Sequence, residues 1–316
     1  MNILGLDIGG TKCAVLLAKE ENEDITFLDR YEIKTEGPWE YVIDKLLDKG
    51  MVMVDNNNIK KEDLVIGISC GGPLDSKRGV IMSPPNLPGW DDVYIVDYIY
   101  RKTNIKAKLK NDADACALAE WKYGAGKGYE NLVFLTFGTG LGAGLILNNA
   151  LYTGANNMAG EVGHIRLEDD GPVGYGKRGS FEGFCSGGGI AQLAKEKARE
   201  LKEQGKNASF VKDNIDDITT KDVALAAKSG YTDAIEVFEL SGKYFGRGLS
   251  IIIDILNPEI IIAGSIFKRS GKFLEKTMYE EIEKEALIHS RKNVKIVPAK
   301  LGEEIGDYGA VVAALV

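Results

Sequence analysis

The sequence opens with NILGLDIGGTKCAVLLA, residues 2–18, and the interpretation of the whole chain starts from this stretch. It predicts an apolar strand that ends at Asp7, a turn at Gly9-Gly10-Thr11-Lys12, and a second strand. Gly9 and Gly10 lack a Cβ atom, so the turn can be sharp and an anion can approach its backbone N–H groups. Asp7 can hold a hydrated Mg²⁺ beside a phosphate, while Thr11 adds a hydroxyl and Lys12 a positive charge. An ordinary hairpin with a surface lysine has the same pattern, so the remaining sequence must decide.

The same design recurs later in the chain. An apolar strand over 132–137 leads into Gly138-Thr139-Gly140-Leu141-Gly142-Ala143-Gly144, and a further strand follows over 145–147. Two such turns suggest duplicated lobes that bind a phosphate chain from both sides. The glycines do not form a dinucleotide-binding motif, because a strand rather than a helix follows them. A Walker A loop is excluded, because no Gly-Lys pair is followed by Ser or Thr.

Composition limits the class of protein. The chain has 316 residues, 44% of them hydrophobic, which is enough for two lobes with separate cores. A net charge of −8 without a basic stripe argues against a nucleic-acid partner. No apolar run reaches the roughly 18 residues of a membrane span and the start does not resemble a signal peptide, so we expect a cytoplasmic protein without a membrane partner. Four scattered cysteines indicate reduced thiols rather than a disulfide framework.

Strands and helices alternate along the chain. An antiparallel start over 3–6, 13–17 and 25–33, followed by helices and further strands, predicts an α/β protein with a mixed sheet covered by helices. A strand over 107–109 runs into Asn111-Asp112, and a helix follows over 113–123. A carboxylate at such a junction lies where α/β proteins place ligand sites, although Asp112 could instead be only a helix N-cap. A third glycine turn, Gly264-Ser265, follows a strand over 259–263 and could hold a nucleotide base or sugar.

These elements match the needs of phosphoryl transfer, which depends on positioning and charge neutralisation. Asp112 would accept the proton of a hydroxyl that attacks the γ-phosphate. The Asn111 amide offers a donor and an acceptor, which suits a vicinal diol of a sugar. Further candidates are Glu161, His164 and Glu182, which lie in a long glycine- and aromatic-rich segment over 158–189. As alternatives, these two carboxylates could be surface groups and His164 a hydrogen-bonded loop residue.

The sequence as a whole resembles the ROK family of repressors and sugar kinases, in particular its glucokinase-like members, within the actin-like ATPase superfamily. The similarity runs in order along nearly the whole chain, through LDIGGTK (6–12), GISCGGPLD (67–75), PNLPGW (85–90), NDADACALAEWKYGAG (111–126), FGTGLGAG (137–144), EVGH (161–164) and LNPEIIIAG (256–264). This resemblance implies two ribonuclease-H-like α/β lobes around a cleft. The small lobe would comprise 1–111 with a C-terminal helix over 303–316, and the large lobe 112–302.

The resemblance also implies roles for individual residues. Asp112 would be the general base. The sugar hydroxyls would be bound by Asn111, Asp112, Glu161, His164 and Glu182, with the backbone near Gly72. MgATP would be bound by Asp7, Gly10, Thr11, Thr139 and Gly264, and the two turns add Gly9, Lys12, Gly138 and Gly140, with Asp7 holding Mg²⁺.

One segment departs from the family pattern. Kinases of the ROK family usually carry Cys-x-Cys-Gly-x-x-Gly-Cys-x-Glu, whose three thiolates join the histidine around a structural zinc. Here Val173, Tyr175 and Ser180 stand at the cysteine positions, which leaves His164 with Cys185 nearby in the sequence. Two donors do not make a closed tetrahedral site, so we expect no structural zinc. We expect packing of Val173, Tyr175 and Phe181 to hold the segment instead.

The resemblance leads to a specific function. We expect an ATP-dependent kinase of a free hexose that phosphorylates a primary hydroxyl, with O6 of glucose as the first choice. Alternative acceptors are an N-acetylhexosamine, fructose or a β-glucoside, and a non-catalytic sugar-binding ROK protein is the alternative from a different class. The repressor branch carries a helix-turn-helix before the first motif, and its absence before Asp7 favours an enzyme. The expected partners are the sugar, MgATP and a second copy in a homodimer.

Overall fold

The computed structural model describes residues 1–316, and their backbone contacts divide them into two compact units. Unit 1 comprises Met1–Gly128, Gly144–Ala159 and Lys300–Val316, and unit 2 comprises Tyr129–Ala143 and Gly160–Ala299. The chain therefore passes between the units four times. The lobe boundaries implied by the family resemblance stay a prediction.

Unit 1 is built on a five-stranded mixed sheet in the order β3-β2-β1-β4-β7. The central strand β1 (Asn2–Ile8) pairs antiparallel with β2 (Lys12–Glu21) and parallel with β4 (Leu64–Cys70). On the outer sides, β3 (Asp24–Lys34) is antiparallel to β2, and β7 (Ala107–Asn111) is parallel to β4. The prediction of a mixed sheet with an antiparallel start is confirmed.

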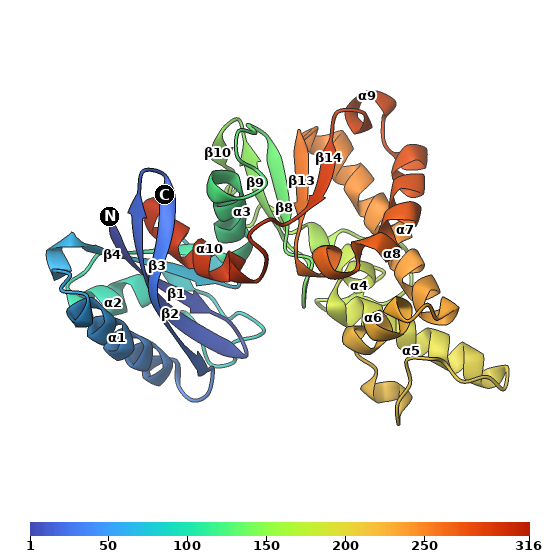
Figure 1. Cartoon of the computed structure of the whole chain (residues 1–316), viewed down its shortest axis with the longest axis horizontal. Coiled ribbons are helices and arrows are strands. Elements are labelled where there is room, and N and C mark those ends of the chain that lie inside the picture. The colour runs from blue at the N-terminus through green and yellow to red at the C-terminus, as the bar shows by residue number, and fades with distance from the viewer. The chain divides into compact units, whose positions relative to one another are not determined.

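Helices cover both faces of this sheet (Figure 1). Side chains of successive strand residues point to opposite faces. Leu4 and Ile66 lie on the face that packs against α1 (Trp39–Asn56) and α2 (Ile95–Thr103) in one apolar cluster. Their neighbours Gly5 and Gly67 face α10 (Ile305–Leu315), which also contacts α3 (Asp112–Tyr123). A Cβ atom at Gly67 would lie 2.1 Å from the Ala310 carbonyl oxygen, so the glycine allows the helix to lie directly on the sheet.

Unit 2 is built on three parallel strands, with β13 (Ile260–Ala263) between β8 (Leu132–Leu135) and β14 (Lys295–Pro298). Its longest helices, α7 (Thr232–Leu256) and α8 (Ser265–Glu285), pack along each other. A Cβ atom at Gly246 of α7 would lie 2.3 Å from the Met278 carbonyl oxygen of α8, which explains why this contact needs glycine. The helices α4 (Phe181–Cys185), α5 (Gly187–Glu203) and α6 (Thr220–Lys228) pack against α7.

Short elements complete the two units. The hairpins are β5 (Leu74–Asp75) with β6 (Val80–Ile81), β9 (Ala143–Leu147) with β10 (Ala150–Leu151), and β11 (Val173–Gly174) with β12 (Lys177–Arg178). The remaining helical turns are α9 (Ile288–Arg291), η1 (Lys61–Asp63), η2 (Val162–His164), η3 (Ile215–Asp217) and η4 (Gly302–Glu304). None of the helices combines the length and the apolar character that a membrane span requires.

Candidate functional site

The first glycine turn follows β1 in unit 1. The Gly9 N–H group donates to the Lys12 carbonyl oxygen at 3.1 Å, and the Thr35 hydroxyl donates to the Gly9 carbonyl oxygen at 2.6 Å. A Cβ atom at Gly10 would lie 2.4 Å from the Asn86 carbonyl oxygen, so this position has no room for a side chain. Thr11 is exposed, and the Lys12 ammonium group pairs with Glu32 at 2.9 Å. Lys12 is therefore a surface cation next to the turn.

Asp7 lies one strand residue before this turn. The parallel register sets Asp7 of β1 beside Ser69 of β4, and Cys70 of β4 beside Asn111 of β7. The carboxyl ends of three parallel strands thus meet at one edge of the sheet, where ligands of α/β proteins bind. Burial, together with the smaller effects of the charges of Asp307 and Asp112, raises the pKa of Asp7 from 3.8 to about 6. A carboxylate in this environment favours a nearby cation.

Asn111 and Asp112 stand at the start of α3 on the same edge. The Asn111 side-chain oxygen accepts the Ala113 N–H group at 3.0 Å, so Asn111 is the N-cap and Asp112 is the first helical residue. The Asp112 side chain is accessible to solvent, yet the protein atoms around its carboxyl group raise its pKa, against the lowering effect of the backbone N–H groups of Ala113 and Asp112. Gly72 lies beside Asn111, because a Cβ atom there would be 3.0 Å from the Asn111 amide nitrogen.

The second glycine turn lies in unit 2 between β8 and β9. It is closed by a bond from the Gly138 N–H group to the Gly140 carbonyl oxygen at 3.1 Å, with Thr139 exposed at its tip. Gly187 at the start of α5 donates to the Gly138 carbonyl oxygen at 2.7 Å. Gly264 follows β13 as the N-cap of α8, and its N–H group donates to the Leu135 carbonyl oxygen at 2.8 Å.

Glu182 connects this turn with the segment over 158–189. One Glu182 carboxylate oxygen accepts the Leu141 N–H group at 2.9 Å. Glu161 and His164 are both exposed, Glu161 as the N-cap of the helical turn η2 and His164 as its last residue. The ring centroid of His164 lies 6.3 Å from that of Tyr175, with the rings in an edge contact. Unit 1 thus gathers Asp7, the first turn, Gly72, Asn111 and Asp112, and unit 2 gathers Glu182 with the second turn.

Comparison with known proteins identifies the family. A sequence model of the ROK family matches residues 3–316. The chain belongs to the ROK family. Among curated ROK proteins, a glucokinase from Halalkalibacterium halodurans is 30% identical over 97% of this chain and 92% of its own length. A xylose repressor from Caldicellulosiruptor bescii is 29% identical over 98% of this chain and 77% of its own length.

Solved structures agree with this assignment. A ROK family glucokinase from Streptomyces griseus, in complex with glucose and AMPPNP, is 26% identical, with a TM-score of 0.81 over 100% of this chain and 99% of that one. The fold is therefore the mixed α/β actin-like ATPase fold of ROK kinases, as the resemblance implied.

The residues of this ROK chain do not fit a structural zinc. Val173, Tyr175 and Ser180 offer no set of thiolates, and the Cys185 thiol donates to the Ser241 carbonyl oxygen of α7 at 3.4 Å. No group of three or more His, Cys, Asp or Glu side chains in the structure is placed to hold a metal.

The expectation that packing of apolar side chains holds this segment is wrong in two of three positions. Phe181 is fully buried, but Val173 is 39% exposed and Tyr175 is 62% exposed. Both residues lie in or beside the β11-β12 hairpin, whose tight turn places their side chains outward. Hydrogen bonds from Gln192 and Ser180 to the backbone of Val173 and Gly174 take the place of the expected packing.

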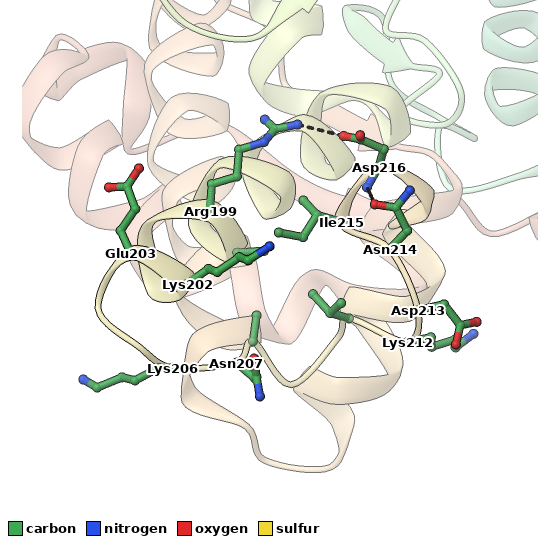
Figure 2. Close-up of a pocket in the computed structure, with 13 residues that line it drawn as sticks. Arg199, Lys202, Glu203, Lys206, Asn207, Lys212, Asp213, Asn214, Ile215 and Asp216 are labelled. Carbon is green, nitrogen blue, oxygen red and sulfur yellow. Dashed lines mark hydrogen bonds and ion pairs between the residues drawn. The ribbon is translucent and has the colours of Figure 1, made fainter.

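A pocket of about 860 Å³ in unit 2 lies apart from all the candidate residues. It is formed by the C-terminal end of α5 and the chain over 206–216, as Figure 2 shows. Its lining includes Lys202, Lys206 and Glu203, and one wall holds the ion pair of Arg199 with Asp216 at 2.8 Å. Charges of both signs line it, so it favours no single class of ligand.

Sequence reasoning missed several residues of the site. The Gly264-Ser265 turn expected after the strand over 259–263 is in fact the start of a helix, because α8 begins at Ser265 directly after Gly264. The start of α5 at Gly187 was missed as well, because three glycines in a row indicate a loop. Ser186 before them is the usable signal, since its side chain caps α5 by accepting the Gly189 N–H group.

Proposed function

We propose that this ROK protein is an ATP-dependent kinase that phosphorylates a free hexose at its primary hydroxyl, with O6 of glucose as the acceptor. The observation that carries the proposal is Asp112, an accessible carboxyl group of raised pKa at the carboxyl edge of the sheet of unit 1. A raised pKa makes a carboxylate a stronger base at neutral pH. The similarity to glucokinases supports the same activity.

In this mechanism Asp112 accepts the proton of the sugar hydroxyl as the hydroxyl oxygen attacks the γ-phosphorus, and ADP leaves. Asn111 and the backbone near Gly72 are proposed to hold neighbouring hydroxyls. Glu161, His164 and Glu182 are the further proposed hydroxyl ligands. These residues fix the acceptor orientation, which is the main protein contribution to phosphoryl transfer.

The glycine turns are the proposed phosphate contacts. The first turn would contribute Gly9, Gly10, Thr11 and Lys12, and the second turn Gly138, Thr139 and Gly140, with Gly264 at the start of α8. The starts of α5 and α8 lie beside the second turn, where the partial positive charge of a helix N-terminus favours a phosphate. Asp7 would hold Mg²⁺ through water, since a nearby cation would stabilise the ionised form of its carboxyl group, whose pKa is raised by burial. Bound Mg²⁺ supplies neutralisation of the phosphate charge.

A sugar panel tests the proposal. ADP release would be measured with MgATP and glucose, mannose, fructose, N-acetylglucosamine, N-acetylmannosamine or cellobiose. We expect glucose to stimulate release most strongly. Asp112→Asn should lower kcat on the order of 10²- to 10⁴-fold while sugar binding persists, because the amide cannot accept the proton. Unchanged turnover in Asp112→Asn would remove Asp112 as the base.

A second candidate is a sugar-binding protein without catalysis. It is favoured by one observation, the similarity to xylose repressors over nearly the whole chain. Such a protein would bind a sugar, detectable by calorimetry, without ADP release from any member of the panel. The homodimer and the cytoplasmic location also stay predictions, and light scattering tests the first of them.

A further inference from the structure

Gln192 of α5 fastens the β11-β12 hairpin. Its side-chain oxygen accepts the Val173 N–H group at 2.9 Å, and its side-chain nitrogen donates to the Val173 carbonyl oxygen at 2.9 Å. A side-chain amide therefore pairs with both backbone groups of one residue, as a neighbouring strand would. Val173 stands at the first of the three positions where zinc-binding relatives are expected to carry cysteine.

The hairpin in turn lies directly against the short helix α4. A Cβ atom at Gly174 would lie 2.4 Å from the Gly183 nitrogen and 2.8 Å from the Glu182 Cβ atom, so there is no space between the two elements. Ser180 joins them, because its hydroxyl accepts the Gly183 N–H group at 3.1 Å and donates to the Gly174 carbonyl oxygen at 3.4 Å. A displacement of Val173 would therefore be transmitted to Glu182.

Glu182 carries the effect to the glycine turn of unit 2. Its carboxylate accepts the Leu141 N–H group at 2.9 Å, and a Cβ atom at Gly140 would lie 2.8 Å from the same oxygen. The contacts form one chain from Gln192 through Val173, Gly174 and Glu182 to Leu141.

We propose that Gln192 is a positioning residue, which holds Glu182 in place for the sugar without any metal. This inference rests on the proposed function for the role of Glu182, but the fastening of the hairpin does not. Where thiolates around zinc would hold the segment, a two-point hydrogen bond to one backbone residue and the Ser180 cap hold it here. The predicted consequence is that chelators do not change the structure of the β11-β12 hairpin, whereas replacement of Gln192 loosens it.

Limited trypsin digestion tests the fastening independently of activity. Lys177 and Arg178 are cleavage sites within the hairpin. In Gln192→Ala, cleavage there should accelerate on the order of tenfold, because two hydrogen bonds that oppose local opening are lost. Gln204→Ala is the matched control, since Gln204 follows the last residue of α5 and is exposed. The zinc chelator 1,10-phenanthroline should leave the wild-type rate unchanged. Equal rates for Gln192→Ala and wild type, or faster wild-type cleavage with the chelator, would overturn the proposal.

Kinetics test the positioning role. Gln192→Ala should raise KM for the sugar on the order of tenfold with kcat within about twofold of wild type, and KM for ATP should rise less than KM for the sugar, because Glu182 also contacts the glycine turn at Leu141. A proportional loss of all three parameters with a lowered melting temperature would indicate general destabilisation and contradict the role. If no sugar is turned over by wild type, the proposed function fails while the trypsin result still decides the fastening.

Discussion

Glu120 is the residue whose replacement should most damage unit 1. It lies in the last turn of α3 with no exposed surface. One carboxylate oxygen accepts the Ala125 N–H group at 2.7 Å, and the other accepts the Leu301 N–H group at 2.8 Å. These two residues stand near two of the points where the chain passes between the units. We therefore predict that Glu120→Gln destabilises unit 1 strongly.

The size of the effect follows from these contacts. Gln keeps one acceptor oxygen for one N–H group but presents an N–H donor to the other, so one charge-assisted hydrogen bond is lost and donors are buried unpaired. Each of these two terms costs about 1–3 kcal/mol, which gives roughly 2–6 kcal/mol in total. For a unit of about 160 residues, where 1 kcal/mol shifts Tm by about 2–4 °C, the expected drop is roughly 4–24 °C.

Differential scanning calorimetry measures this drop. Glu36→Gln is the control, because Glu36 is 76% exposed and its ion pair with Lys34, at 3.7 Å, is a surface contact of little energetic weight. Its Tm should match the wild-type value within about 1–2 °C. If Glu120→Gln also melts within this range, the reasoning about the buried carboxylate is refuted.

Three further predictions concern unit 1. The Asp7 carboxyl group has a pKa raised from 3.8 to about 6, so its ionised form lowers the stability of the folded protein above pH 6, and this cost disappears as the pH falls toward the pKa of the unfolded chain. Asp7→Asn should therefore stabilise the Mg²⁺-free protein by roughly 2–3 kcal/mol at pH 7.5 and progressively less below pH 6. Equal Tm values of the variant and wild type at pH 7.5 would contradict this prediction. Gly67→Ala should destabilise unit 1 by roughly several kcal/mol, because its Cβ atom would lie 2.1 Å from the Ala310 carbonyl oxygen. Gly5→Ala should cost less, because the atoms nearest to its Cβ atom are side-chain carbons, the first at 3.1 Å. Urea unfolding compares the two variants, and the reverse order of stability would contradict the prediction. Since Asp112 must be ionised to accept a proton, kcat/KM should fall on the acid side at a pH above the usual aspartate range, and a pH–rate profile that stays flat into that range would exclude its raised pKa.

Much of the fold could be predicted because its signals are local. Runs of apolar residues and the paired glycines Gly9 and Gly10 mark β1, β2 and the turn between them within residues 2–18. The Asn111-Asp112 junction is equally local, since a strand ends and a helix begins there. The start of α8 at Ser265 escaped prediction, because Gly264-Ser265 after a strand indicates a turn as much as the start of a helix.

The contacts that hold the site together could not be predicted in the same way. Glu120 is bonded to Leu301, 181 positions away, and nothing near either residue indicates the pairing. The Gln192 contact is invisible for the same reason, and without it packing was the natural expectation for Val173. The sequence shows which residue types are present, but the exposure of Val173 and Tyr175 depends on the hairpin turn.

The close contact of α10 with the sheet at Gly5 and Gly67 has a consequence for synthesis of the chain. The two glycines belong to β1 and β4, which lie within the first 70 residues, whereas α10 occupies Ile305–Leu315. During translation, α10 can cover its part of the sheet only after residues 305–315 have been made. A chain truncated before Ile305 would therefore lack this cover on the earliest-made part of unit 1, and we expect such a truncation to be as damaging as one near the middle of the chain.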